Sequence, residues 1–278
     1  GNMDSGSTAS PLTGLIHQSP NQLQACNSLV EILRYRAQHQ PNQVAYIGLE
    51  NGETESARLT YAQLDQQARA TAAHLQSLGA SGTRVLLTFP LSDGLAFTAA
   101  FFGCLYSGAI AITAWPPLND SLLSELQYKA VDAEVQFALT IDPLLTQSKD
   151  AFEQAPPLNQ IHSVATDQLE KAKAASWQTC QYTEKDIGIC WLPLYHDLGL
   201  VGAVIQPVYA GGPVVMMSPV DFILKPLRWL QAISRYRGTT SGGPNFAFDL
   251  CTRIISPAQI ADLDLSSGAI CVNGAEAV

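Results

Sequence analysis

Short apolar segments alternate with helix-length segments along most of the chain, and this alternation constrains the fold more than any other feature. The apolar segments are RVLLTFP (84–90), AIAITAW (109–115), VQFALTI (135–141), DIGICWLPL (186–194), PVVMM (213–217) and AICVN (269–273). Strands that alternate with helices indicate βαβ units and a mostly parallel sheet. Nearly continuous apolar strands indicate a sheet covered on both faces. We therefore predict an α/β fold with mostly parallel, doubly wound sheets and flanking helices.

Helix starts and one hairpin can also be placed from local patterns. VAYIGL (44–49), the turn ENGE and SARLT read as a β-hairpin. Ser and Thr followed three residues later by Glu or Gln form capping boxes, which satisfy free backbone N–H groups at a helix start. Such starts are predicted at Ser28 with Glu31 and at Thr60 with Gln63, and a simple cap at Ser92. Later helices are predicted at about 198–209, 226–237 and 245–255.

The chain has 278 residues, 47% of them hydrophobic, which suffices for one large domain or two smaller ones. Residues 1–22 begin with the small, polar GNMDSGSTAS and read as an expression remnant and leader, so we expect the fold in residues 23–278. The stretch 142–184 is more polar and is predicted to be irregular and to join two subdomains.

Several protein classes do not fit the composition. The net charge is −9 and the basic residues are scattered, whereas a nucleic-acid surface needs a clustered positive face. No apolar run approaches the roughly 20 residues of a membrane span, and no secretory signal is visible. The six cysteines show no C-x-x-C pair or zinc spacing, so we expect reduced thiols in a cytoplasmic protein and no metal site formed by them.

Three unusual loops follow predicted strands. They are WLPLYHDLGL (191–200), SGGPN (241–245) and NGAE (273–276). Ligands of open parallel sheets bind beyond the carboxyl ends of the strands, so the loops together predict a site. Each loop alone also has a purely structural interpretation. In WLPLYHDLGL, Asp197 could cap a helix beside a buried His196. SGGPN could be a glycine turn before a helix capped by Asn245, and NGAE could be a type I′ turn.

These loops carry a resemblance to a known family. WLPLYHDLGLVGAVIQPVYAGGPVVMM, TTSGGPNFAFDLCTRI and VNGAEAV resemble the fatty acyl-AMP ligases of the adenylate-forming superfamily. The earlier segments LTYAQLDQQARATAAHLQSLGA and AFFGCLYSGAIAITAWPP are similar to that family's first segments. The resemblance covers roughly residues 23–278 and implies the amino-terminal part of its AMP-binding domain.

The resemblance implies an activity and a set of site residues. Such enzymes use ATP and Mg²⁺ to activate a long-chain fatty acid as an acyl-adenylate. They then transfer the acyl group to the phosphopantetheine arm of an acyl carrier protein, often to start a polyketide or lipopeptide. His196 is implied as catalytic at the junction of the acyl group and the nucleotide. The implied substrate-binding residues are Asp197, Ser241, Gly242, Gly243, Pro244 and Asn245, and those implied to lie against adenosine are Asn273, Gly274, Ala275 and Glu276.

The chain departs from the family pattern in two places. The phosphate-binding loop with its lysine is expected before WLPLYHD, but only QTCQYTEKD separates Trp177 from Ile187. The family's later motifs and its carboxyl-terminal domain are also expected to be absent. We therefore predict a fragment, with ATP and Mg²⁺ bound mainly by segments outside it. An acyl-CoA ligase and a non-catalytic acyl-binding remnant remain alternatives.

Overall fold

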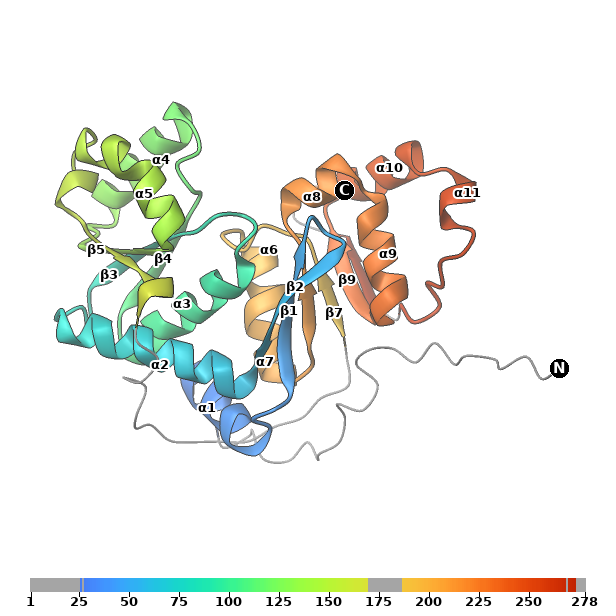
Figure 1. Cartoon of the computed structure of the whole chain (residues 1–278), viewed down its shortest axis with the longest axis horizontal. Helices are drawn as coiled ribbons and strands as arrows, with labels where there is room; N and C mark the ends of the chain where they lie inside the picture. Colours follow the sequence, from blue (N-terminus) through green and yellow to red (C-terminus); the bar gives the residue numbers. More distant parts are fainter. Residues whose placement is uncertain (1–25, 27, 170–186, 269, 274–278) are drawn as a thin grey trace.

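The computed structural model describes residues 26, 28–169, 187–268 and 270–273, which form two sheets flanked by helices (Figure 1). The strands are β1 (Val44–Glu50), β2 (Thr54–Thr60), β3 (Arg84–Thr88), β4 (Ile110–Ala114), β5 (Phe137–Thr140), β6 (His162–Ala165), β7 (Gly188–Cys190), β8 (Val214–Met216), β9 (Thr240–Gly243) and β10 (Ile270–Asn273). The helices are α1 (Leu29–His39), α2 (Tyr61–Ser77), α3 (Gly94–Ser107), α4 (Asp120–Asp132), α5 (Asp142–Glu153), α6 (Asp197–Gly199), α7 (Gln206–Ala210), α8 (Pro219–Leu224), α9 (Leu227–Tyr236), α10 (Asn245–Ile254) and α11 (Pro257–Ile260). The predicted α/β class with mostly parallel sheets is confirmed.

The smaller sheet has the order β4-β3-β5-β6, and its strands are all parallel. Successive residues of β3 enter different cores because side chains alternate across a strand. Val85 and Leu87 join the core that contains α2 and α3, whereas Leu86 joins the core that contains α4 and α5. Helices therefore cover both faces, as predicted for a doubly wound sheet.

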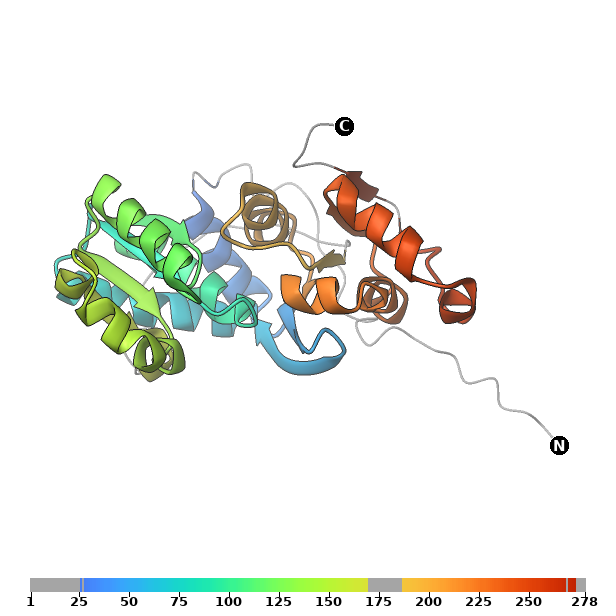
Figure 2. The same cartoon turned by 90° about the horizontal axis from the view of Figure 1, so that it is seen from above.

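The larger sheet has the order β10-β9-β7-β8-β1-β2, and only the β1–β2 hairpin is antiparallel. Ala203, Val204 and Val208, which follow β7, pack on one face in the core that they share with the small sheet. Helices α8, α9 and α10 pack on the opposite face in a second core. Each face therefore has its own layer of helices (Figure 2).

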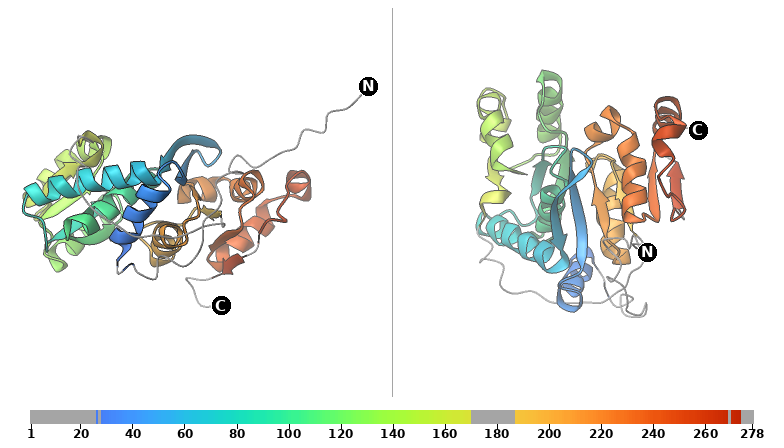
Figure 3. Two further views of the ribbon diagram at one scale, coloured as in Figure 1. Left: turned by 90° about the horizontal axis from the view of Figure 1, so that it is seen from below. Right: turned by 45° about the vertical axis from the view of Figure 1, so that its right-hand side comes forward.

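The hairpin forms the edge of the larger sheet on the side of the smaller sheet (Figure 3, right). Tyr46 of β1 is fully buried, and its hydroxyl donates to the Val204 carbonyl at 2.8 Å. Both predicted helix starts next to the hairpin are confirmed: the Ser28 hydroxyl accepts from Glu31 N–H, and Thr60 and Gln63 form a reciprocal capping box. The core under α2 and α3 of the small sheet is continuous with one core of the large sheet, because Val85, Leu87 and Tyr46 belong to the same cluster.

Three sequence predictions about elements are wrong. The range 142–168 is regular, because α5 and β6 lie within it and β6 pairs with β5; the remainder of the predicted joining stretch, 170–184, lies outside the described residues. The cap position of α3 is Asp93, not Ser92. Residues 240–243 form strand β9 rather than a loop, which extends the parallel sheet by one strand.

Candidate functional site

The larger sheet contains a switch point between β7 and β9. These strands are parallel neighbours, with Gly188 opposite Thr240 and Ile189 opposite Ser241. The chain leaves β7 toward one face and leaves β9 toward the other, where Ala247 of α10 is buried. Adjacent strands whose connections leave on opposite faces open a crevice beyond their carboxyl ends, which is where ligands of doubly wound sheets bind.

The predicted loops share this edge of the sheet. His196 and Asp197 follow β7, and Pro244 and Asn245 follow β9. Asn273 ends β10, and its backbone lies opposite Gly243. Gly274, Ala275 and Glu276 lie outside the described residues. The prediction that these loops lie on one rim is confirmed for the loops after β7 and β9 and for Asn273. The roles of their residues remain predictions.

His196 is held at the start of a helix by its neighbour. Its Nδ1 lies 2.7 Å from Asp197 Oδ1, which also accepts a hydrogen bond from Leu198 N–H at 2.8 Å. Nδ1 also lies 3.4 Å from Leu198 N–H, from which it accepts a hydrogen bond as the cap of the helix. The imidazole is about half exposed (49%), so the reading of His196 as a buried structural histidine is wrong. His196 itself occupies the cap position that the structural reading gave to Asp197.

The glycine of YHDLG is required by close packing. The chain turns at Pro193, whose carbonyl accepts from His196 N–H at 3.2 Å. A Cβ on Gly199 would lie 2.2 Å from the same carbonyl oxygen. Since real Cβ atoms never approach so closely, only glycine lets the helix start fold against the turn.

The helix that begins at Asp197 contains a π-helical segment. α6, the π segment Leu200–Ile205 and α7 form one run to Ala210. Pro207 lacks an N–H and so removes one donor from the run. π segments within helices are frequent at functional sites. The far end is fixed by the buried Arg36, which donates to the carbonyls of Val208 and Tyr209.

Ser241 is engaged by the protein on both sides. Its hydroxyl accepts from Trp229 Nε1 at 2.7 Å and donates to the Ile189 carbonyl at 2.6 Å. The side chain therefore ties β9 to β7 and to α9. Helix α10 begins at Asn245 with Pro244 at the cap position, so Asn245 is not the cap.

Tyr195 belongs to the same loop and was not among the predicted site residues. Its ring lies 4.0 Å from that of Trp115, and its carbonyl accepts from Thr113 Oγ1 at 3.3 Å. Its hydroxyl is buried without a hydrogen-bond partner among the described residues, and burial raises the pKa of Tyr195. It lies within WLPLYHDLGL, but its contacts come from the end of β4 in the other sheet, which that motif does not reveal.

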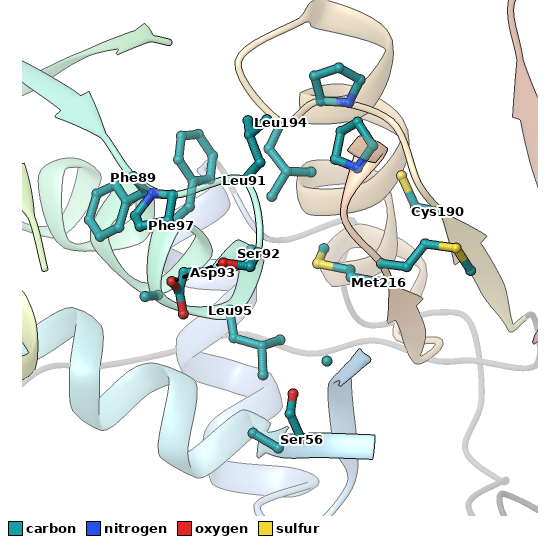
Figure 4. A pocket seen from close by; sticks show the side chains of 18 of the residues that line it. Ser56, Phe89, Leu91, Ser92, Asp93, Leu95, Phe97, Cys190, Leu194 and Met216 are labelled. Atoms are coloured by element: carbon teal, nitrogen blue, oxygen red, sulfur yellow. Dashed lines mark hydrogen bonds between the residues drawn. The ribbon is translucent and has the colours of Figure 1, made fainter. Parts of the chain in front are cut away.

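A cavity of about 300 Å³ lies between the two sheets, beside this loop (Figure 4). Phe89, Asp93 and Leu95 line it from the segment after β3, and Leu194 and Met216 line it from the other side. Burial raises the pKa of Asp93. Neither His196 nor the 241–245 loop lines this cavity. The sequence pattern that could have indicated this cavity is FPLSDG (89–94), in which polar residues follow a strand end. We interpreted it only as the start of a helix.

The described residues hold no group of three His, Cys, Asp or Glu side chains placed to bind a metal ion. Burial raises the pKa values of Cys104 and Cys190 to about 12, so both thiols are protonated at neutral pH. No helix among the described residues is long and apolar enough to cross a membrane.

Comparison with known proteins agrees with this geometry. A curated relative, the medium-chain fatty acid–acyl carrier protein ligase JamA of Moorena producens, is 37% identical over 297 residues, which cover 91% of this chain and 50% of JamA. The crystal structure of a fatty acid AMP ligase from Legionella pneumophila matches with a TM-score of 0.83 and 34% identity over 91% of this chain and 50% of that one. A second Legionella structure, determined with acyl adenylate and pyrophosphate, matches with a TM-score of 0.81, 34% identity and the same coverage.

The chain thus spans about half the length of the relatives that it matches. The profile of the family described as AMP-binding enzyme matches in two segments, residues 33–178 and 168–278. These segments meet where the sequence predicts a shortened connection before WLPLYHD. Because the two matches together cover most of the chain, this chain belongs to the AMP-binding enzyme family.

Proposed function

We propose that this chain is the amino-terminal part of an enzyme that activates a fatty acid with ATP and transfers it to an acyl carrier protein. The observation that carries the proposal is the pairing of β7 with β9, because it brings two loops that resemble the fatty acyl-AMP ligases to one edge of the sheet. JamA is named as a medium-chain ligase that acts with a carrier protein, which supports both the reaction and the partner. Polyketide or lipopeptide assembly and a cytoplasmic location remain predictions.

Two helix starts flank the crevice and suit anionic substrates. The run from Asp197 and the helix from Asn245 both begin at this edge. A helix amino terminus presents free N–H groups and a partial positive charge, which favours carboxylates and phosphates. A fatty acid carboxylate and a nucleotide phosphate are the two anions that adenylation must bring together.

His196 is suited to position the carboxylate. Its Nδ1 contacts Asp197 Oδ1 and Leu198 N–H at the helix start, and its ring is about half exposed. Adenylation is an in-line attack of a carboxylate on a phosphorus atom, so positioning and stabilisation of developing charge supply most of the catalysis. A ring N–H of the exposed imidazole can donate a hydrogen bond to an oxygen of the substrate. The described residues do not fit a Mg²⁺ site, so no step is assigned to the metal.

The experiment is fatty-acid-dependent exchange of pyrophosphate into ATP by the full-length protein. We expect exchange with medium- or long-chain acids and a loss of about 10²–10³-fold in kcat/KM for His196→Ala. Exchange that needs no fatty acid, or none with any acid of the series, would contradict the proposal. Acyl transfer to a carrier protein, with free coenzyme A as the competing acceptor, separates a carrier-protein ligase from a coenzyme A ligase.

A non-catalytic acyl-binding protein is the second candidate. It is favoured by the short connection between Trp177 and Ile187, where the family's phosphate loop is expected. Saturable fatty acid binding without any exchange of pyrophosphate would support it over the ligase.

A further inference from the structure

Trp115 is attached to a rigid part of the backbone at the carboxyl end of the small sheet. It directly follows β4, and its carbonyl accepts a hydrogen bond from Oγ1 of the buried Thr88 at 3.2 Å. Pro116 and Pro117 come next. A proline fixes its own φ and restricts the residue before it to extended backbone, so the chain has little freedom here. The indole ring therefore starts from a fixed point of the small sheet.

The end of β4 holds the loop that carries His196 in two ways. The ring of Tyr195 lies 4.0 Å from that of Trp115, with 38° between the two planes. Thr113 Oγ1 donates a hydrogen bond to the Tyr195 carbonyl at 3.3 Å. Both the side chain and the backbone of the residue before His196 are thus held by the small sheet, although β7 and His196 belong to the large one.

The same loop borders an unfilled space. Pro193, Leu194 and Tyr195 line the cavity of about 300 Å³ between the sheets, so packed side chains do not support the loop on that side. The bond from His196 N–H to the Pro193 carbonyl fixes the shape of the turn but not its position. The Tyr195 hydroxyl has no hydrogen-bond partner among the described residues, so contact of the ring holds this side chain. The contacts with Trp115 and Thr113 therefore oppose a shift of the loop.

We propose that Trp115 is a positioning residue that fixes His196 through the ring of Tyr195. This inference rests on the function proposed above, in which His196 orients the fatty acid carboxylate. Tyr195 and His196 are consecutive residues, so a shift of the Tyr195 ring into space left at position 115 also moves the imidazole. Misplacement of a catalytic group by about 1 Å can cost about 100-fold in rate. Trp115 itself is assigned no contact with the substrate.

The first test is fatty-acid-dependent exchange of pyrophosphate into ATP by the full-length protein. Trp115→Leu should lower kcat about tenfold or more and change KM for the fatty acid and ATP less than about threefold, because the imidazole moves while the other binding groups stay. Trp115→Phe keeps a ring against Tyr195 and should retain kcat within about threefold of wild type. Thr113→Val removes the hydrogen bond to the Tyr195 carbonyl with little change of shape. It should also lower kcat, and it replaces the leucine variant if that variant does not fold.

A double variant distinguishes positioning from a general loss of stability. In the His196→Ala background, Trp115→Leu should change kcat less than about twofold, because the group that it positions is gone. Phe137→Leu is the matched control, since it removes an aromatic ring from the same sheet at the amino-terminal end of β5, where the ring meets His162. This control should leave kcat within about twofold of wild type.

Histidine side-chain NMR signals provide a measurement that does not depend on activity. The ring signals of His196 should shift in Trp115→Leu and Thr113→Val but not in Phe137→Leu. Unchanged His196 signals in the folded variants would overturn the inference. So would an equal loss of kcat with and without His196, or a loss no larger than that of Phe137→Leu. Absence of exchange by the wild type with every acid would count against the proposed function, and the NMR signals would still decide whether Trp115 fixes His196.

Discussion

Removal of the Ser241 hydroxyl should destabilise the fold before it affects substrate binding. The hydroxyl pairs with the indole N–H of Trp229, which is 2% exposed, and with the carbonyl of Ile189. In Ser241→Ala both groups remain buried without this partner. An unsatisfied buried group costs about 1–3 kcal/mol, so we expect the free energy of unfolding to fall by roughly 2–4 kcal/mol.

A double-mutant cycle with Trp229→Phe isolates the bond. Urea unfolding of the two single variants and the double variant should give a coupling energy of about 1 kcal/mol, the usual net worth of a neutral hydrogen bond. Thr252→Ala serves as the control, because its exposed hydroxyl only donates to the Asp249 carbonyl and its loss should cost less than about 0.5 kcal/mol.

The alternative for Ser241 is a direct contact with substrate, as the family resemblance implies. In that case Ser241→Ala would raise KM for the fatty acid while stability stayed within about 0.5 kcal/mol of wild type. That pair of results would refute the reasoning from the hydrogen bonds.

Three other predictions follow from buried ionisable groups. Asp65→Asn should cost about 3–5 kcal/mol in urea unfolding, because it removes the counter-charge of the buried Arg34; a loss below about 1 kcal/mol would contradict this. Burial raises the pKa of Asp93 in the folded state, so wild-type stability falls as pH rises through that range. Asp93→Asn should therefore have a higher Tm than wild type at pH 7, but not at a low pH where the Asp93 carboxyl of the wild type is also neutral. A difference in Tm that does not change with pH would contradict this. Burial raises the pKa of Cys251 to about 11, so its alkylation by iodoacetamide should quicken about tenfold per pH unit through pH 9 and 10, without a plateau there.

The hydrophobic pattern predicted the architecture well because both sheets are covered on two faces. A strand such as β3 is then apolar at successive positions, Val85–Leu87, and it stands out from the helices around it. Strand β9 was missed for the opposite reason. Its residues Thr240–Gly243 are small: Ser241 pairs with the Trp229 indole, and the Trp191 ring leaves no room for a side chain at Gly243. β6 was missed because the polar helix α5 precedes it and the strand is only four residues long.

The candidate site was predictable only in part. Strand ends and a family resemblance identified His196, Asp197 and the 241–245 loop, and the neighbouring positions of β7 and β9 bring them to one edge. The partners that fix these residues come from elsewhere in the chain. Trp115 lies against Tyr195 from the other sheet, and Trp191 lies beneath Gly243 with no spacing that relates them. Such contacts depend on the crossover order, which a local pattern does not contain.

Gly199 and Gly243 are required by contacts within the protein rather than by a ligand. From sequence, glycines at strand ends suggest that a ligand approaches the backbone closely. In the structure, the close approach is made by protein: by the Pro193 carbonyl at Gly199 and by the Trp191 ring at Gly243. Gly199 lets the helix start pack against its own turn, and Gly243 lets the end of β9 pack against Trp191, so alanine at either one should shift the backbone beside the site rather than fill the site. A bound ligand should then partly restore the stability lost in these variants, because binding to the folded state stabilises that state. If the added side chain instead blocked the site, the ligand would not raise the stability of the variant.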